Sequence, residues 1–396
     1  MRNWIRMCLV SGLTATVLTS SSCHAAPADR APLKIAQRNE VPQRLATRPD
    51  ALHSRVRSEL RVFTQWLQAN KVRGFIGEVG WPDDVKGDAQ SWNRLADAWL
   101  GDADKAGLWV TTWATGEWWG TSYPLAPYER RLTGEGVDSP NTQAATLEAH
   151  RGTRQILRGV NVSGGEFGSA SNINPGVYDQ QYHYDPQGTF TYLASRGFKL
   201  VRLPFRWERL QRNLNSELDA TELGRLKGAV ARARRAGLNV VLDMHNYGDY
   251  QTEKDGKGVR QTIGSPEVPN AAFADVWRRL SREFKSDAGV FYGLMNEPHD
   301  FPAQNGKSGA QVWEVAAQVA LNAIRANGDK KLVMVPGYNW SGAQGWAGTH
   351  PKSWIVDPTN NFRYEAHHYW DRDNSGDYPD RYSDEVQNAE QRGFKP

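Results

Sequence analysis

The stretch that decides the fold is Tyr292-Gly-Leu-Met-Asn-Glu-Pro-His299. An apolar run ends here in an Asn-Glu pair, so a carboxylate stands at the tip of a short buried strand. If this carboxylate works together with a second one, the partner has to come from another strand. Little chain remains after Pro298 to supply it from a later strand. The best candidate lies upstream, in Arg73-Gly-Phe-Ile-Gly-Glu-Val-Gly-Trp-Pro82. We therefore expect Glu297 and Glu78 to meet only if the first strands of the chain close a barrel with the last.

Short apolar runs alternate with amphipathic helical patterns from residue 51 onward. Strands are expected at residues 74–79, 108–115, 156–163, 200–204, 238–245, 290–296, 332–336 and 362–369, and helices at 55–69, 92–106, 142–150, 189–196, 221–236, 271–285 and 311–326. Such alternation implies parallel strands joined by crossover helices. Eight of these strands close a (β/α)8 TIM barrel, which would occupy residues 51–396 as one domain.

The N-terminal residues are typical of an exported protein. Arg2 and Arg6 precede an apolar stretch and then small residues, the layout of a signal peptide that ends at Ala25. The apolar stretch is too short to cross a bilayer, so no membrane-spanning segment is expected. Residues 26–50 are expected to form an extended leader. We expect a secreted or periplasmic monomer, with a lipid anchor on Cys23 as the alternative.

Composition excludes some classes of partner. The formal net charge is only +4 and both signs are interspersed, which argues against nucleic acid. No His-Glu-x-x-His or paired-cysteine spacing indicates a metal, and no glycine-rich phosphate loop indicates a nucleotide, so we expect no cofactor. The chain has 16 tryptophans, and the cluster of Trp109, Trp113, Trp118 and Trp119 is interpreted as a stacking surface for sugar rings.

Several further motifs accompany the two carboxylates. They are Arg158-Gly-Val-Asn-Val-Ser-Gly-Gly-Glu-Phe-Gly168, Val201-Arg-Leu-Pro-Phe-Arg-Trp207, Leu242-Asp-Met-His-Asn-Tyr247 and His367-His-Tyr-Trp-Asp-Arg-Asp-Asn-Ser-Gly376. From Arg158 onward the chain resembles the cellulases of glycoside hydrolase family 5, in their first-to-sixth-strand order. The family's seventh and eighth strands resemble residues 77–80 and 109–120, at the front. The resemblance thus implies a circularly permuted barrel. The alternative is a hybrid gene whose front segment does not complete the site.

The resemblance also implies roles for individual residues. Glu297 would be the acid/base and Glu78 the nucleophile of a retaining reaction, which needs the two carboxyl groups about 5–5.5 Å apart. The remaining expected residues lie around the nucleophile or the sugar: Arg202, His245, Asn296, His367, Tyr369 and Trp113. The implied function is a secreted endo-acting β-glucanase that hydrolyses β-1,4-glucosidic bonds in a β-glucan. Alternatives are a β-mannanase, a β-1,3-glucanase, a transglycosylase or a non-catalytic glucan-binding barrel.

Other carboxylates and histidines compete for these roles. Glu166, after the first family strand, is an alternative nucleophile that is better placed to line the cleft, and Glu117 is a weaker one. His368 is excluded because it points to the other face of its strand. Asp243, inside its strand, is expected to buttress the barrel. One or both of the tails, the leader before Arg55 and the segment after Asp371, are expected to border the substrate groove, so that truncation near Gly376 would change kinetics more than stability.

Overall fold

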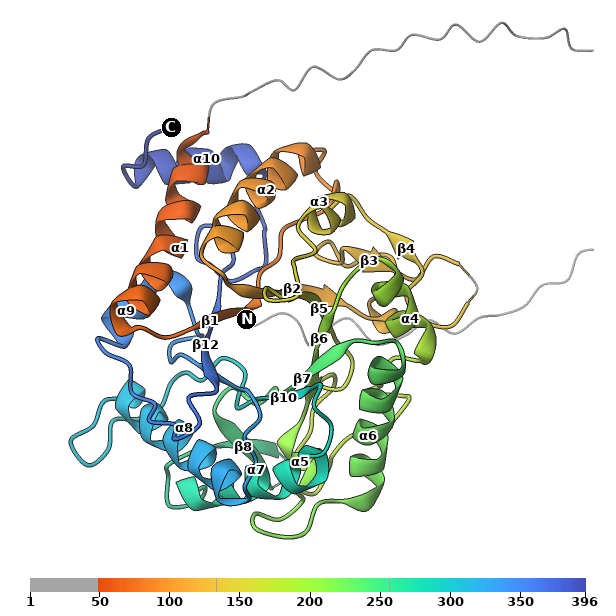
Figure 1. The fold of residues 1–396 in the computed structure, drawn as a ribbon, viewed down its shortest axis with the longest axis vertical. Coiled ribbons are helices and arrows are strands. Elements are labelled where there is room, and N and C mark those ends of the chain that lie inside the picture. The colour runs from red at the N-terminus through yellow and green to blue at the C-terminus, as the bar shows by residue number, and fades with distance from the viewer. Residues whose placement is uncertain (1–48, 133, 256) are drawn as a thin grey trace, which may run out of the picture. The chain divides into compact units, whose positions relative to one another are not determined.

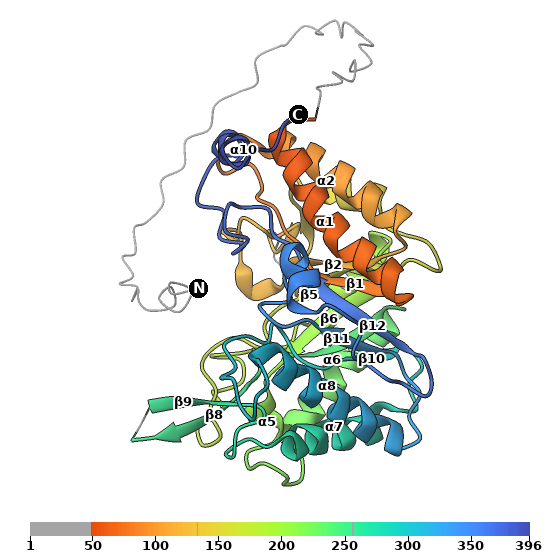
Figure 2. The same ribbon diagram turned by 90° about the vertical axis from the view of Figure 1, so that its left-hand side faces the viewer.

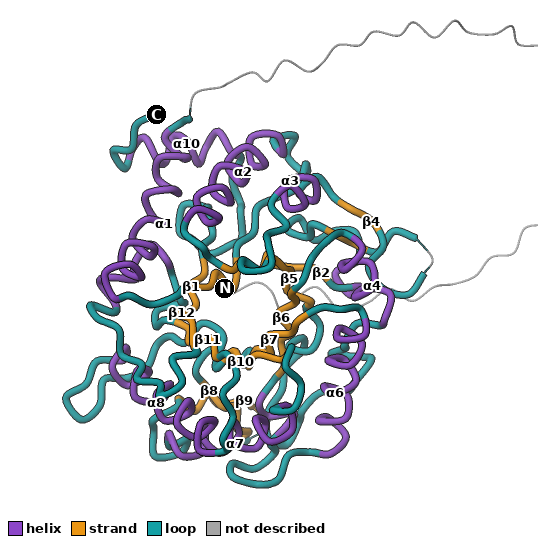
Figure 3. The backbone as a smooth tube through the Cα atoms, in the orientation of Figure 1, coloured by secondary structure: helices purple, strands orange, loops and turns teal. Residues whose placement is uncertain are grey.

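The barrel strands follow the short apolar runs of the sequence. The computed structural model describes residues 49–396 apart from 133 and 256, and eight of its strands form a closed parallel barrel (Figures 1 and 3). They are β1 (Gly74–Glu78), β2 (Trp109–Thr115), β5 (Arg158–Val162), β6 (Leu200–Phe205), β7 (Asn239–Met244), β10 (Val290–Gly293), β11 (Val333–Pro336) and β12 (Phe362–His367). Each strand pairs with the next one along the chain, and β12 closes onto β1. The predicted (β/α)8 barrel is therefore confirmed.

Helices form the outer layer around this ring (Figure 3). The longer ones are α1 (Ala51–Asn70), α2 (Ala89–Lys105), α4 (Gln187–Ser195), α6 (Ala220–Arg235), α7 (Asn270–Phe284) and α8 (Gly309–Ala326), and the short ones are α3 (Ala144–Ala149), α5 (Trp207–Leu210) and α9 (Trp346–Thr349). Local sequence sets their ends. Helix α1 begins where the Asp50 carboxylate accepts a hydrogen bond from the His53 amide, and α8 begins at a capping box of Ser308 and Gln311.

The last helix, α10 (Tyr382–Gln391), was not predicted from the sequence. It lies beside α1 in the outer layer (Figures 1 and 2). The Tyr382 hydroxyl donates to the Asp50 carboxylate at 2.8 Å, and the Tyr382 ring packs edge-on against Trp92. Ala389 is fully buried. The C-terminal tail is thus part of the packed structure, and it contacts the start of the described chain.

Two small antiparallel sheets lie outside the barrel. One pairs β3 (Tyr128–Glu129) with β4 (Ser139–Pro140), and the other pairs β8 (Asp249–Lys254) with β9 (Lys257–Thr262). The second directly follows β7 and projects from the body of the protein (Figure 2). Two single 3-10 turns, η1 (Glu117–Trp119) and η2 (Ala343–Gly345), complete the elements. The sequence predicted neither sheet, because β3 and β4 have two residues each and β8 and β9 are mostly polar.

The amino-terminal end of the barrel is closed by a separate apolar cluster. It consists of Phe75, Leu157, Leu200, Val241, Leu332 and Met334, and the rings of Trp109 and Phe291 pack against it. Residues from Asp50 onward form one compact unit. The expected signal peptide and nearly all of the expected leader lie outside the described residues. Within the described ranges, no helix has the length and apolarity that a bilayer span requires.

Candidate active site

The expected site residues come together at the carboxyl ends of the strands. Glu78 ends β1, His367 ends β12 and His245 directly follows β7. Glu297 lies in the loop after β10, with φ at +42°. The carboxyl ends of parallel barrel strands meet at one mouth, where enzymes of this fold place their chemistry. Strand order therefore brings Glu78 close to residues far away in sequence.

Glu78 is held by two donors. Arg202 donates from Nη1 to Glu78 Oε1 at 3.0 Å, and the Tyr369 hydroxyl donates to Oε2 at 2.7 Å. Burial and the charge of Glu78 raise the pKa of Tyr369 well above its usual value, so its phenol keeps the proton that it donates. Both contacts favour an ionised, fixed Glu78 carboxylate.

Arg202 is fully buried and is the centre of the charge network. Its Nη2 lies 2.9 Å from Asp243 Oδ1, and its Nε lies 3.0 Å from Glu365 Oε1. Burial alone would lower the pKa of Arg202, but Asp243, Glu365 and Glu78 together raise it above its usual range. Arg202 thus stays charged. Asp243 buttresses the site as expected.

Glu365 was missed in the sequence analysis. Period-two alternation places it on the same barrel-facing side of β12 as His367, two residues later, and this spacing was the available signal.

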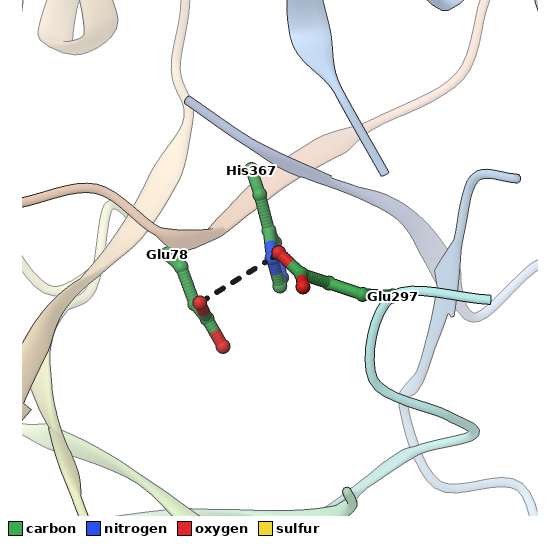
Figure 4. A group of neighbouring side chains, drawn as sticks. All are labelled: Glu78, Glu297 and His367. Carbon is green, nitrogen blue, oxygen red and sulfur yellow. Dashed lines mark hydrogen bonds and ion pairs between the residues drawn. The ribbon is translucent and has the colours of Figure 1, made fainter. Parts of the chain in front are cut away.

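His367 lies between the two candidate catalytic carboxylates (Figure 4). Its Nδ1 is 2.8 Å from Glu297 Oε1 and 3.5 Å from Glu78 Oε2, and its Nε2 is 3.4 Å from Glu365 Oε1. Burial opposes protonation, but Glu78 and then Glu297 and Glu365 outweigh it and raise the pKa of His367 to about 10. The ring is therefore an imidazolium that donates from both nitrogens. One carboxylate oxygen of Glu78 and one of Glu297 lie within 4.8 Å of each other.

Asn296 and His245 are fixed by neighbours in the same network. The Asn296 carbonyl oxygen accepts from Arg202 Nη2 at 2.7 Å, which leaves its amide nitrogen as the group that can donate to a ligand. His245 Nδ1 lies 2.7 Å from Asp243 Oδ2, and its ring stacks on Trp113 at a centroid distance of 5.5 Å. Each of the six expected supporting residues therefore reaches this mouth.

Aromatic rings line the mouth on two sides. On one side Trp119 stacks on Tyr123 at 3.9 Å, and Tyr123 accepts a hydrogen bond from Trp113 Nε1. On the other side His299 stacks on Trp340 at 3.3 Å, and Tyr247 contacts both. Tyr247 and Trp340 were not singled out from the sequence, since neither belongs to a tryptophan cluster.

The expected stacking surface was wrong in one member. Trp109 begins β2 at the opposite end of the barrel, against Phe291. Trp113 ends up at the catalytic mouth because it is four residues further along the same strand. Trp118, which follows β2, stacks on His183 at 5.1 Å.

The contacts of the competing residues differ from those of Glu78 and Glu297. Glu166 accepts from the Gly164 amide at 2.8 Å and lies near His245, and burial raises the pKa of Glu166. Glu117 accepts from the Gly136 amide at 2.8 Å, so it holds a loop. His368 faces outward between helices, where it contacts Trp99 and Glu59.

Comparisons with known proteins identify the family of the chain. The model of the cellulase family, glycosyl hydrolase family 5, matches residues 138–395. A manganese dependent endoglucanase from Phanerodontia chrysosporium is 31% identical over 268 residues, which cover 66% of this chain and 65% of that protein. An endoglucanase from Neurospora crassa is 33% identical over 221 residues, which cover 55% of this chain and 51% of that protein.

Solved structures give the same result. A triple mutant of an endo-β-1,4-glucanase from Xanthomonas axonopodis pv. citri superposes with a TM-score of 0.50 and 38% identity, over 59% of this chain and 73% of that one. The chain spans between 51% and 65% of the length of the two curated relatives above. The family match itself covers more than half of this chain. The chain therefore belongs to glycosyl hydrolase family 5, the cellulase family.

Proposed function

We propose that this chain is a retaining, endo-acting β-glucanase that hydrolyses β-1,4-glucosidic bonds. One observation carries the proposal: oxygens of Glu78 and Glu297 approach within 4.8 Å at the barrel mouth. Retaining glycosidases hold their two carboxyl groups about 5–5.5 Å apart, whereas inverting ones leave about 6.5–9.5 Å for a water molecule. The short separation supports double displacement.

In this mechanism Glu78 attacks the anomeric carbon while Glu297 gives a proton to the departing glycosidic oxygen. A covalent glycosyl-enzyme forms and the aglycone leaves. Glu297 then takes a proton from water, which attacks the same carbon and releases Glu78. The contacts from Arg202 and Tyr369 suit Glu78 to the ionised role, because they favour its charged form.

The other residues would act on the sugar. The Asn296 amide would donate a hydrogen bond to the 2-hydroxyl of the sugar. This contact strengthens in the transition state. Trp113, backed by His245, would stack on the pyranose ring beside the cleaved bond. The His367 imidazolium would keep both carboxylates in place, since it contacts each of them.

A resident cation does not fit this site, although one relative is named as manganese dependent. Atoms of Glu78, Glu297 and His367 lie near enough to share an ion. However, both His367 nitrogens are already directed at carboxylate oxygens, Nδ1 at Glu297 and Nε2 at Glu365. The Glu78 carboxylate is in turn held by Arg202 and Tyr369. We therefore propose metal-independent chemistry for this chain.

The decisive experiment has two readouts. Purified protein is incubated with carboxymethyl cellulose, mannan and laminarin, and the product sizes and the anomeric configuration of the first product are measured by NMR. Rapid loss of viscosity on carboxymethyl cellulose with a β-anomer as first product is expected. Preference for mannan or laminarin would replace the substrate, an α-anomer would contradict retention, and no activity on any of the three would favour a glucan-binding barrel.

We also propose that the barrel is circularly permuted relative to its family. The family match at residues 138–395 contains β5, β6, β7, β10, β11 and β12, while β1 and β2 precede it. The front pair would correspond to the two strands that relatives carry last. A rearranged chain that runs from 138 to 396 and then, through a short linker, from 50 to 137 should fold and stay active. The C-terminal helix lies along α1, because the Tyr382 hydroxyl donates to Asp50 and Arg392 lies 4.0 Å from Glu59. An inactive but folded rearranged chain would contradict this order.

Export is the remaining proposal. We propose that the N-terminal segment directs the protein out of the cytoplasm and is removed after Ala25. Cell fractionation and N-terminal sequencing of the isolated protein test it. A cytoplasmic, uncleaved chain would contradict it, and lipid on Cys23 would support the anchored alternative.

A further inference from the structure

The amino-terminal end of the barrel, opposite the catalytic mouth, carries a groove of about 760 Å³. We call it the amino-terminal groove. It is lined by Arg73, Trp109, Lys285, Ser286, Ala288, Phe291, Gly328, Asp329, Lys330, Lys331, Leu332, Asn361 and Arg363. Its volume falls within the range of about 300–1,000 Å³ that small-molecule sites occupy. The rings of Trp109 and Phe291, which pack on the apolar cluster at this end of the barrel, give the groove an apolar wall.

The charge balance of the groove is strongly positive. Five of its lining residues are cationic and one, Asp329, is acidic. Asp329 is buried, and its two oxygens accept from the Tyr292 hydroxyl and from the Lys331 amide, at 2.7 and 2.8 Å. This carboxylate is therefore occupied by its own neighbours. It leaves most of the positive charge of the groove unbalanced.

Arg363 is the most informative of these cations. Only 7% of it is exposed, and within the described part of the chain it has no carboxylate partner. One nitrogen donates to the Gly74 carbonyl at 2.9 Å, while its buried Nε meets no acceptor among the described residues. Its guanidinium lies 4.3 Å from the centre of the Trp109 ring. Burial of an unpaired cation is costly, so such a group marks a place where an anion would be stabilising.

Helix stabilisation explains only part of this pattern. Lys285 caps the C-terminus of α7, where a cation interacts favourably with the helix dipole. Arg363 and Arg73 belong to β12 and to the residue before β1, so no helix end accounts for them. Burial and the neighbouring charge of Arg73 lower the pKa of Arg363 to about 10, which still leaves it charged at neutral pH.

We propose that the amino-terminal groove binds a small organic anion that carries a ring, such as an aryl phosphate or an aromatic carboxylate. The acidic group would approach Arg363, Lys285 and Lys330, and the ring would pack on Trp109 and Phe291. This site lies at the end of the barrel that the proposed hydrolysis does not use, so it stands independently of that proposal.

Fluorine NMR with 4-fluorophenyl phosphate tests the site, and neutral 4-fluorobenzyl alcohol serves as the uncharged probe. We expect millimolar or tighter binding of the phosphate, competition by benzoate, and no displacement by saturating cellobiose. The double variant Lys285→Glu, Lys330→Glu should weaken binding about tenfold or more. The matched variant Lys352→Glu, Lys395→Glu has the same net charge change elsewhere on the surface and should change binding less than about twofold.

Both double variants should keep the far-UV circular dichroism spectrum of the wild type, which shows that they fold, and any hydrolytic activity of the wild type should be unchanged. Equal binding of the neutral probe, displacement by cellobiose, equal weakening in the two double variants, or no detectable binding of 4-fluorophenyl phosphate would each overturn the proposal.

Discussion

The two ends of the barrel treat charge in opposite ways. At the carboxyl end, each of two buried cations contacts carboxylates: Arg202 contacts Glu78, Asp243 and Glu365, and His367 contacts Glu78, Glu297 and Glu365. At the amino end, Arg363 is buried without a carboxylate partner in the described residues. The same barrel thus carries a closed network, in which the buried cations are paired with carboxylates, at its carboxyl end. At its amino end a buried cation has no carboxylate partner among the described residues.

Because of this difference, substitutions at the two ends should have different effects. In a closed network every group depends on the others, so removal of one charge leaves a buried partner uncompensated. At the amino end the cations face a groove, and reversal of exposed ones should affect only what binds there. We therefore expect large effects on activity and stability at the carboxyl mouth, and none on hydrolysis at the amino mouth.

The largest effect is expected at the two carboxylates. Glu78→Gln and Glu297→Gln should each lower kcat by roughly 10³-fold or more, because each loses a covalent or proton-transfer role. Glu166→Gln is the matched control, since Glu166 lies near the same mouth and accepts from the Gly164 amide. It should keep most of the activity. Reducing-sugar assays on carboxymethyl cellulose measure all three variants, and a dead Glu166→Gln with a live Glu78→Gln would show that the nucleophile is misassigned.

The two carboxylates also illustrate what the sequence could supply. The Asn-Glu pair at the end of an apolar run located Glu297, and the eight apolar runs were enough for the barrel. Glu78 needed the further step of looking upstream for a second carboxylate and of placing its strand by the family resemblance, since its own surroundings are common. In the structure β1 pairs with β12, and this pairing brings Glu78 beside His367.

Other features had no comparable signal. Helix α10 has a short and mostly polar sequence, and its stability comes from packing on α1, which only the folded structure reveals. Trp109 and Trp113 share one cluster in the sequence but lie at opposite ends of a strand, because a strand rises about 3.3 Å per residue. Proximity in the chain was therefore a poor guide to which rings share a site.

The second-largest effect concerns the tail. Packing predicts the reverse of what the sequence indicated: truncation after Gly376 should reduce stability more than it changes kinetics. It removes the buried side chains of Tyr378, Tyr382 and Ala389, with a cost of about 3–6 kcal/mol. Urea unfolding measures this cost. Tyr382→Phe, which removes the hydroxyl and its contacts with Asp50 and His53, should cost about 1 kcal/mol. An unchanged unfolding midpoint on truncation would restore the original expectation.

A smaller loss of stability is expected within the closed network. Asp243→Asn removes a buried charge that Arg202 and His245 both contact, and it should destabilise the protein by about 3 kcal/mol. Asp102→Asn is the surface control. Its partner Arg57 is partly exposed, so this pair should contribute less than about 1 kcal/mol. Equal losses for the two variants in urea unfolding would mean that the barrel network contributes no more than a surface ion pair.

The last effect is a change of stability with pH. The folded pKa of His367 is about 10 and its ordinary value is 6.5, so the native state holds this proton more tightly than the unfolded chain. The resulting stabilisation is fully present below pH 6.5 and is lost as the pH rises towards 10. Melting temperatures of the wild type should therefore fall across this range more steeply than those of His367→Gln, which lacks the titrating group. The acidic groups that face His367 are Glu78, Glu297 and Glu365, and Asp243 interacts with its charge. The comparison with His367→Gln assigns the loss to the imidazolium itself. Parallel slopes for the two proteins would show instead that His367 is neutral in the folded state, and the carboxyl mouth would then lack one of the two cations that distinguish it from the amino end.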